Sequence, residues 1–174
     1  KNYVVPMHVP DASGPVGWVV GASMMARTSV FTEIGLFDET FFLYFEETDL
    51  FRRAHLAGFK TDYVRESHVA HIGSVSTGMK TWDRIPTFWL NSRSHYFTKN
   101  HGRAYAAAAT LMHLIGGALW RVRRLVQNKP KADPAHFLRD LLFHDLRALA
   151  RPLPGKRRAV PSRPTRTATE IRAE

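Results

Sequence analysis

Apolar residues recur at helical spacing in the middle of the chain. Between residues 46 and 57, the apolar positions that lie on one helical face are Leu50, Phe51, Ala54 and Ala57. Gly58 follows, and glycine is the residue that most often ends a helix. The pattern therefore predicts a helix over residues 46–57 whose first turn carries three carboxylates.

Longer helical patterns occupy the C-terminal half. We expect Pro86 to start a helix that ends near Asn100, with Gly102 directly after it. Residues 104–120 carry no Asp, Glu, Lys or Arg, and residues 134–150 place their leucines and Phe137 on one face. Both segments are expected to be amphipathic helices.

Short apolar runs predict strands over residues 3–5, 18–20, 60–64 and 68–72. The strand over residues 18–20 is expected to be buried. Residues 28–34 favour a short helix, capped by Thr28 or Ser29 and ended by Gly35.

Composition narrows the class of protein. A chain of 174 residues with 44% hydrophobic residues suits one domain with a core and argues against wholesale disorder. The absence of cysteine excludes disulfides and thiolate metal sites. Because the chain begins with Lys1 and no signal peptide follows, we expect a piece of a longer product or a processed chain.

The net charge of +10 is concentrated in the C-terminal half and suggests an anionic partner. Trp120 follows the uncharged segment and stands beside Arg121, Arg123 and Arg124. This arrangement is typical of a helix lying in an anionic membrane surface, and the alternative is a helix packed on the domain or on a partner. Residues 151–174 indicate a basic disordered tail. No nucleic-acid-binding motif is present, so we expect no nucleic-acid partner.

The densest candidate chemistry is a cluster of three carboxylates, Glu46, Glu47 and Asp49, directly after the aromatic run 41–45. On a helix, Glu46 and Asp49 share a face, while Glu47 projects about 100° away from Glu46. An apolar environment raises the pKa of a carboxyl group, which suits a general base near neutral pH. The alternative is an acidic first turn in which Asp49 pairs with Arg53.

Two histidines follow. On the predicted strand, His68 and His71 point to opposite faces, so they are not expected to bind one metal together. One of them would bind a metal ion together with ligands from elsewhere. The alternative is that each histidine has only a structural role.

Several separate blocks resemble the second half of family 2 glycosyltransferases. They are residues 18–27, 31–35, 37–39 and 41–50, together with Arg53, residues 57–58 and His71. The likeness is to rhamnosyltransferase-like and galactofuranosyltransferase-like members. It implies an α/β fold of the GT-A type, built around a mostly parallel sheet. It also implies a nucleotide-sugar donor, Mg2+ or Mn2+, and inversion at the transferred sugar.

The resemblance also implies roles for individual residues. Glu47 stands where the family has its general base, and Glu46 and Asp49 would bind acceptor hydroxyls or hold the base. His71 looks like a metal ligand. The wall on the acceptor side would comprise Trp18, Gly21 and Ala22.

Two departures from the family pattern matter. The base position is commonly Asp, whereas this chain has Glu47, whose extra methylene shifts the carboxylate by about 1 Å. The family's Asp-x-Asp motif does not occur, and the nucleotide-binding strands are absent too. We therefore expect no transferase activity from the isolated chain.

The sequence thus predicts a partial GT-A domain over residues 1–102, amphipathic, membrane-associated helices over 103–150 and a basic tail over 151–174. The predicted activity is metal-dependent, inverting transfer of a sugar to a cell-surface glycan or lipid-linked acceptor. We expect it at the cytoplasmic face of a bacterial plasma membrane. The alternative is a non-catalytic, truncated copy that binds membrane or a partner.

Overall fold

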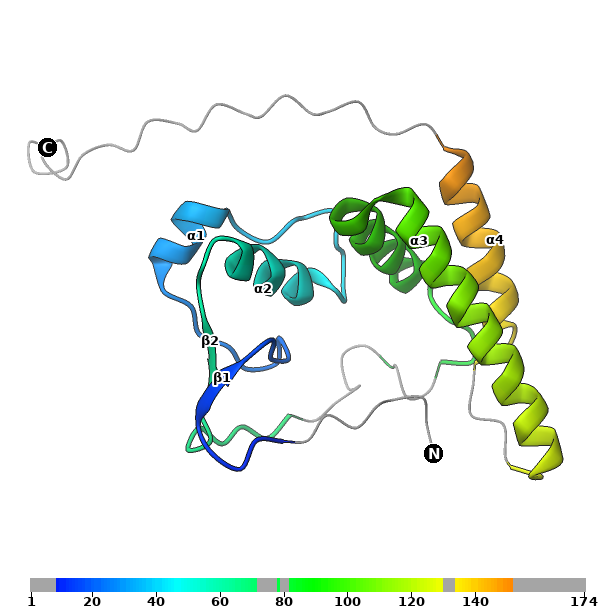
Figure 1. Cartoon of the computed structure of the whole chain (residues 1–174), viewed down its shortest axis with the longest axis horizontal. Helices are drawn as coiled ribbons and strands as arrows, with labels where there is room; N and C mark the ends of the chain where they lie inside the picture. Colours follow the sequence, from blue (N-terminus) through cyan, green and yellow to red (C-terminus); the bar gives the residue numbers. More distant parts are fainter. Residues whose placement is uncertain (1–8, 72–77, 79–81, 130–133, 152–174) are drawn as a thin grey trace, which may run out of the picture.

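The computed structural model describes residues 9–71, 78, 82–129 and 134–151, and these contain much helix and little strand (Figure 1). The elements, in chain order, are β1 (Gly14–Val16), α1 (Thr28–Ile34), α2 (Glu46–Leu56), β2 (Thr61–Tyr63), α3 (Thr87–Val126) and α4 (Phe137–Ala150). In Figure 1, α1, α2 and the strands form one group, and α3 and α4 lie side by side next to it. Within these residues the parallel sheet of a GT-A domain is not seen, so that fold stays a prediction.

The two central helices form where the sequence places them. Helix α2 ends at Leu56 and has Ala57 as its C-cap, whose N–H donates to the carbonyl of Arg53 at 3.1 Å, and Gly58 follows with a φ of 87°. Helix α1 ends at Ile34 and has Gly35 as its C-cap, with a φ of 81°. The predicted cap of α1 is wrong, because Thr28 and Ser29 are both already inside the helix, which begins at Thr28. Arg27 is its N-cap and makes no side-chain capping bond.

The strands agree with the sequence only in part. The predicted strand over 60–64 is confirmed as β2, which pairs antiparallel with β1 so that Gly14 faces Tyr63. The buried strand predicted over 18–20 is wrong. The strand lies four residues earlier, where Ser13 fixes the register by donating to Glu66 at 2.6 Å and accepting from the Arg65 N–H at 2.8 Å.

Residues 68–71 are exposed and extended, with no strand pairing among the described residues, so the strand predicted there is wrong over this part. Residue 72 and the strand predicted over 3–5 lie outside the described residues, as do residues 152–174.

Helix α3 joins the two helices that the sequence predicts on either side of Gly102. The glycine has a φ of 83° and a ψ of 168°, so the helical path bends there before it continues to Val126. A positive φ costs glycine little, which explains why the bend falls at this residue. The domain boundary expected after residue 102 therefore falls inside one bent helix.

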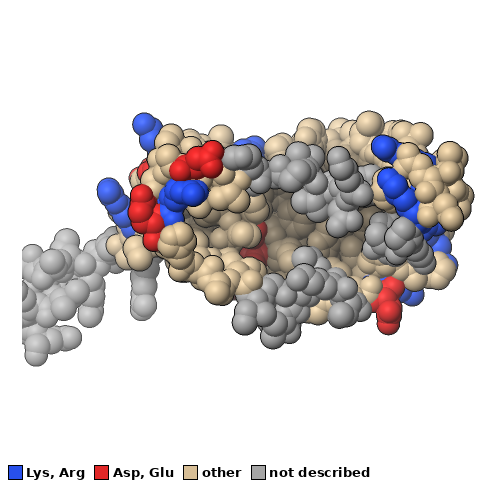
Figure 2. All heavy atoms as spheres, turned by 90° about the horizontal axis from the view of Figure 1, so that it is seen from below, with Lys and Arg blue, Asp and Glu red and all other residues tan. Residues whose placement is uncertain are grey.

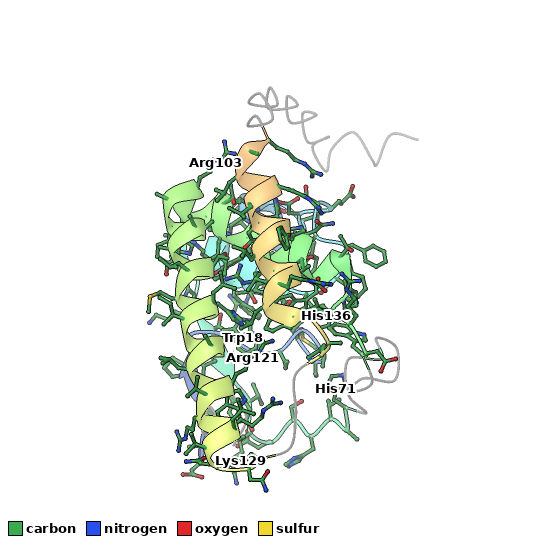
Figure 3. The ribbon with its side chains drawn as sticks, turned by 90° about the vertical axis from the view of Figure 1, so that its right-hand side faces the viewer. Trp18, His71, Arg103, Arg121, Lys129 and His136 are labelled. Atoms are coloured by element: carbon green, nitrogen blue, oxygen red, sulfur yellow. The ribbon has the colours of Figure 1, made fainter. Side chains whose placement is uncertain are left out.

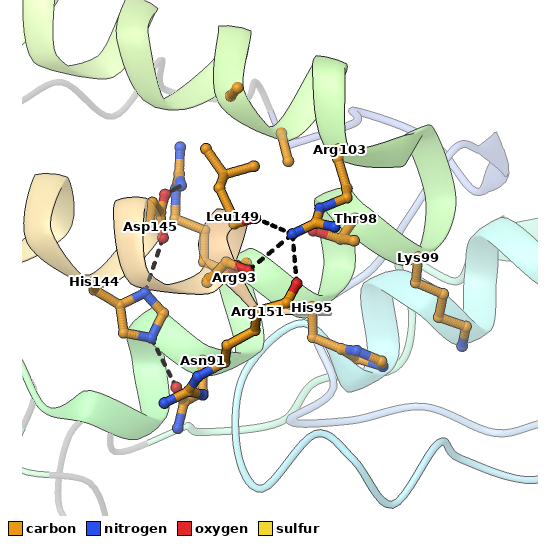
Figure 4. A pocket seen from close by; sticks show the side chains of 14 residues that line it. Asn91, Arg93, His95, Thr98, Lys99, Arg103, His144, Asp145, Leu149 and Arg151 are labelled. Atoms are coloured by element: carbon orange, nitrogen blue, oxygen red, sulfur yellow. Dashed lines mark hydrogen bonds and ion pairs between the residues drawn. The ribbon is translucent and has the colours of Figure 1, made fainter. Parts of the chain in front are cut away.

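A buried ionic cluster holds α4 against both parts of α3. Arg93, before the bend, donates to the hydroxyl of Thr110 at 3.0 Å and to the carboxylate of Asp145 at 2.9 Å. Thr110 in turn donates to Asp145. The guanidinium of Arg103, at the bend, donates to the carbonyl of Arg151 at 2.7 Å and to that of Leu149, where the negative end of α4 favours a cation (Figure 4). The segment 104–120 thus packs on another helix of the domain.

A second buried carboxylate joins α2 to α3. Asp49 is 0% exposed and accepts three charged or amide donors: Arg53 Nε at 2.8 Å, Lys99 Nζ at 2.8 Å and Asn100 Nδ2 at 3.0 Å. Lys99 also donates to Asp38 at 2.9 Å, on the loop before α2. The Asp49–Arg53 pair, which the sequence offered as the alternative to a catalytic role for this cluster, is therefore confirmed.

The same set of bonds also reaches the end of α1 and the loop that follows it. Arg53 donates to the carbonyls of Ile34 at 2.6 Å and Leu36 at 2.8 Å, so one guanidinium ties the end of α1 to α2. Burial alone would raise the pKa of Asp49, but the donors Lys99, Asn100 and Arg53 lower it overall. We name this set the Asp49 network: Asp38, Asp49, Arg53, Lys99 and Asn100.

We expect Asp49→Ala to lower the free energy of unfolding by about 3 kcal/mol, because it leaves buried cations without their shared carboxylate. Urea denaturation of the full chain measures this. Asp11→Ala, at an exposed aspartate, is the control and should stay within about 0.5 kcal/mol of the parent. Equal midpoints for both variants would show that the network does not stabilise the fold.

The network also predicts how stability depends on pH. Burial raises the pKa of Asp38, but bonds from His95, Thr40 and Lys99 bring it well below its usual range. A depressed carboxyl pKa stabilises the folded state above the unfolded value of about 3.9, and this contribution is lost as the pH falls further. Unfolding midpoints should therefore drop below about pH 4, and less steeply in Asp49→Ala. A parent chain whose midpoint stays flat from pH 5 to 3 would contradict this.

Candidate active site

The start of α2 has an unusual backbone. Tyr44 and Phe45 both lie in the left-handed region, with φ of 68° and 70°. Bulky residues avoid this conformation, at a cost of about 1–2 kcal/mol each. Ring contacts hold them there: Phe45 with Trp89 at 6.0 Å and Tyr96 at 5.6 Å, and Tyr44 stacked on Phe88 at 6.3 Å. The strained turn fixes where the next residues, the candidate carboxylates, begin their helix.

Glu47 is half-buried beside the N-terminal segment. Burial raises its pKa above the ordinary value, the neighbouring charge of Glu46 raises it further, and backbone N–H groups oppose the shift only in part. Gly21 packs directly against it, since an added Cβ there would lie 3.4 Å from Glu47 Cβ and 3.5 Å from Cγ. Ala22, next along the chain, is exposed. Of these two small residues, Gly21 therefore allows the N-terminal segment to approach Glu47 closely.

Glu46 offers an unused acceptor. Its Oε2 is buried and has no hydrogen-bond partner among the described residues. A buried carboxylate oxygen without a donor is costly, so such an atom in a native fold calls for an explanation. A ligand hydroxyl that donates to Glu46 would supply the missing bond.

Trp18 lies next to α2, beside residues of the helix that follow Glu47. It lines a cavity of about 370 Å3 together with Thr48, Arg52 and Tyr96, among others. The indole N–H of Trp18 and Nε of Arg52 also lack partners among the described residues. Sequence analysis missed Arg52 and Tyr96. The signal for Arg52 was its spacing of four from Thr48, which puts both on one helical face.

The structure thus brings Gly21 and Glu47 together at the start of α2, next to Glu46, while Trp18 lies further along the same helix beside Thr48 and Arg52. Asp49 lies behind them, fully enclosed by its three donors. The chemistry available is a carboxylate with a raised pKa next to unpaired polar atoms, an arrangement found where hydroxyl groups are bound and deprotonated.

His71 is exposed at the end of the described stretch 9–71 (Figure 3). In the part of the chain that the structure describes, no three His, Asp or Glu side chains come close enough to hold a metal ion. A metal bound by His71 would need ligands from outside these residues, so we derive no step from it.

The basic residues expected at a membrane lie in the last turns of α3. Figure 2 shows Lys and Arg side chains at the end of the molecule where α3 and α4 lie. Lys129 stands over the ring of Trp120 at 5.9 Å, and Arg123 bonds Gln127 at 3.3 Å, while Arg121 and Arg124 are half-buried. The described helices include none with a stretch long and apolar enough to cross a bilayer.

An exposed apolar face runs along α3 toward these cations. Its members repeat every three or four residues and are Met112, Ile115, Leu119, Val122 and Val126. Four of them are more than 60% exposed, Val126 as much as 81%, which is unusual for a row of large apolar side chains. A row of this kind marks a surface that meets another apolar surface.

Known proteins similar to this chain are rhamnosyltransferases. It is 42% identical over 64 residues to N-acetylglucosaminyl-diphospho-decaprenol L-rhamnosyltransferase of Mycobacterium tuberculosis, which is 37% of this chain and 21% of that protein. It is 39% identical over 56 residues to rhamnosyltransferase WbbL of Escherichia coli K12, which is 32% of this chain and again 21% of the relative. The chain thus matches about a fifth of the length of these relatives.

No family model matches the chain, and no solved structure matches it. The partial matches support a glycosyltransferase-like identity for about a third of the chain. They agree with the rhamnosyltransferase part of the predicted resemblance.

Glu46→Gln should lower the pKa of Glu47, because it removes the neighbouring negative charge that raises it. The 13Cδ chemical shift of Glu47, followed against pH by NMR, measures this. Glu39→Gln, at an exposed residue on the loop before α2, should leave the Glu47 titration where it is. An identical Glu47 midpoint in the parent and in Glu46→Gln would contradict the geometry.

Proposed function

We propose that this chain supplies the acceptor side of a glycosyltransferase that moves a sugar, rhamnose by analogy with its relatives, from a nucleotide-sugar donor to a lipid-linked glycan. The observation that carries the proposal is Glu47, a half-buried carboxylate of raised pKa beside the unpaired oxygen of Glu46. The similarity to rhamnosyltransferases supports the same class of reaction.

In this mechanism Glu47 is the general base. Its carboxylate takes the proton from an acceptor hydroxyl as that oxygen attacks the anomeric carbon and the nucleoside diphosphate leaves from the opposite face. Attack in line with the leaving group inverts the anomeric centre. Raising the pKa of the carboxyl group strengthens it as a base, which is the chemical use of the burial at Glu47.

The neighbouring residues would orient the acceptor. Glu46 would accept a hydrogen bond from a second hydroxyl, and Trp18, Gly21 and Ala22 would form the wall beside it. Gly21 leaves room for the longer side chain at a position where the family commonly has Asp. Asp49 would act as a positioning residue, because its three bonds fix the first turn of α2 and leave it no exposed surface.

A Mg2+ or Mn2+ ion is part of the proposal. When bound, it would stabilise the charge on the departing diphosphate. His71 would contribute one ligand, with the others from outside the described residues, and the donor site would also lie elsewhere.

Replacing Glu47 by Gln should lower kcat at least about a hundredfold, since general base catalysis contributes about 10²–10⁴. The assay uses the full-length gene product, a nucleoside diphosphate rhamnose and an N-acetylglucosaminyl-diphospho-polyprenol, with donor binding measured separately. Donor affinity should be unchanged, and Glu39→Gln should transfer at the parental rate. Unchanged turnover in Glu47→Gln would remove Glu47 from this role, and transfer by the isolated 174-residue chain would refute the need for a separate donor site.

A second proposed activity is membrane contact through α3. The exposed apolar face and the cluster Trp120, Arg121, Arg123 and Arg124 fit the inner face of a bacterial plasma membrane, where a lipid-linked acceptor would reside. This contact alone would also suffice for the alternative, a non-catalytic module that binds membrane or a partner.

Removing Arg123 and Arg124 by Ala substitution should weaken binding to vesicles with anionic lipid about thirtyfold, because each surface cation contributes about 1 kcal/mol. Vesicle flotation of the full chain measures this. The control variant Arg27→Ala/Lys60→Ala removes the same charge from exposed positions elsewhere and should float like the parent. Equal losses in both variants would mean that α3 provides no specific membrane surface.

A further inference from the structure

An apolar pocket lies between the start of α3, its second part and the start of α4. It has a volume of about 580 Å3 and is lined by Trp82, Ile85, Trp89, Met112, Phe137 and Leu138, among others. Of the described residues that line it, none is Asp, Glu, Lys or Arg. The size is that of a small-molecule site, and the lining favours an uncharged hydrocarbon.

The backbone of α3 is adapted to form this pocket. A Cβ added to Gly117 would lie 2.6 Å from Cδ2 of Leu138, so glycine there lets α4 approach closely enough for Leu138 to become part of the wall. Met112 lines the pocket and is 64% exposed, so it belongs both to the pocket and to the exposed apolar face of α3.

Aromatic rings connect the pocket to the candidate carboxylates. Phe45, which directly precedes Glu46, lies 6.0 Å from Trp89, and Trp89 lies 6.2 Å from Phe137. Trp89 and Phe137 both line the pocket. The pocket therefore begins one ring contact away from the strained turn that positions Glu46 and Glu47.

We infer that this apolar pocket binds the isoprenoid units nearest the diphosphate of a polyprenyl-linked acceptor. The inference rests on the proposed function, which places the acceptor sugar at Glu46 and Glu47. A polyprenyl chain is branched, uncharged and free of hydrogen-bonding groups. This suits a lining whose described side chains are apolar apart from His113 and the indoles of Trp82 and Trp89. A peptide would bring backbone N–H and C=O groups that need partners in a pocket with few to offer.

The position of the pocket suits a tethered ligand. A sugar held at the start of α2 leaves its lipid tail to run past Phe45 and Trp89 into the pocket, and the exposed apolar face beyond Met112 leads on toward the basic end of α3. The proposed site therefore receives only the first part of the lipid, and the remainder would stay in the membrane.

Titration calorimetry of the full chain with farnesyl diphosphate, below its micelle concentration, tests the inference. Geranyl diphosphate, one isoprene unit shorter, should bind about tenfold more weakly because less apolar surface is buried. Inorganic diphosphate should bind at least a hundredfold more weakly than farnesyl diphosphate. Equal affinity for all three would overturn the inference, since it would assign binding to the diphosphate alone.

A matched pair of variants locates the site. Met112→Glu places a charge at the mouth of the pocket and should weaken farnesyl diphosphate binding at least tenfold. Leu111→Glu changes the neighbouring residue, which is 57% exposed and does not line the pocket, and should stay within about twofold of the parent. Equal losses would overturn the assignment to the pocket, and sedimentation showing that Met112→Glu dissociates a dimer would assign the surface to a second copy instead.

The test is separate from that of the transferase reaction. Farnesyl diphosphate binding sensitive to Met112→Glu supports the pocket even if Glu47→Gln keeps its turnover, which would refute only the base. Loss of turnover in Glu47→Gln with no farnesyl preference would refute only the pocket.

Discussion

A single buried carboxylate, Asp49, connects the parts of this protein that would otherwise have little reason to stay together. It sits in the first turn of α2, has no exposed surface, and accepts donors from its own helix and from α3. Through Arg53 the same cluster reaches the end of α1, and through Lys99 it reaches the loop before α2. With only short strands and a few fully buried apolar side chains among the described residues, the fold relies on this network to place α1 and α2 against α3, while the cluster of Arg93 and Asp145 places α4.

The network helps to hold Glu46 and Glu47 in a defined position. Glu47 is itself bonded only within its own helical turn as far as the described residues show, and one oxygen of Glu46 has no donor among them. The turn before them is strained at Tyr44 and Phe45, and it persists because Asp49 anchors the helix on one side and aromatic rings enclose the turn on the other. Three neighbouring carboxylates thus have different environments. Asp49 is ionised and paired, Glu47 has a raised pKa, and Glu46 keeps a buried oxygen without a donor. This separation of roles supports assigning the base to Glu47.

Sequence patterns predicted the helices well because their signals are local. The spacing of Leu50 and Ala54 predicted α2 correctly, and Gly35 and Gly58 marked the ends of α1 and α2. Gly102 was predicted to follow a helix end, but it lies at a bend inside α3. The strand at 14–16 could not be predicted, because bonds of Ser13 to Arg65 and Glu66, far away in the sequence, help to decide its place and register. The grouping of Gly21 with Glu47 followed from the family resemblance, but the unpaired oxygen of Glu46, the role of Arg52 and the apolar pocket depend on three-dimensional packing that no local pattern encodes.

The most direct measurement is NMR of the full chain with 13C-labelled glutamate, titrated with N-acetylglucosaminyl-diphospho-farnesol as a soluble acceptor. If the start of α2 is the acceptor site, the 13Cδ resonances of Glu46 and Glu47 will shift and saturate together, while that of Glu39 stays fixed. Resonances of Glu46 and Glu47 that do not move at saturating ligand would contradict the account.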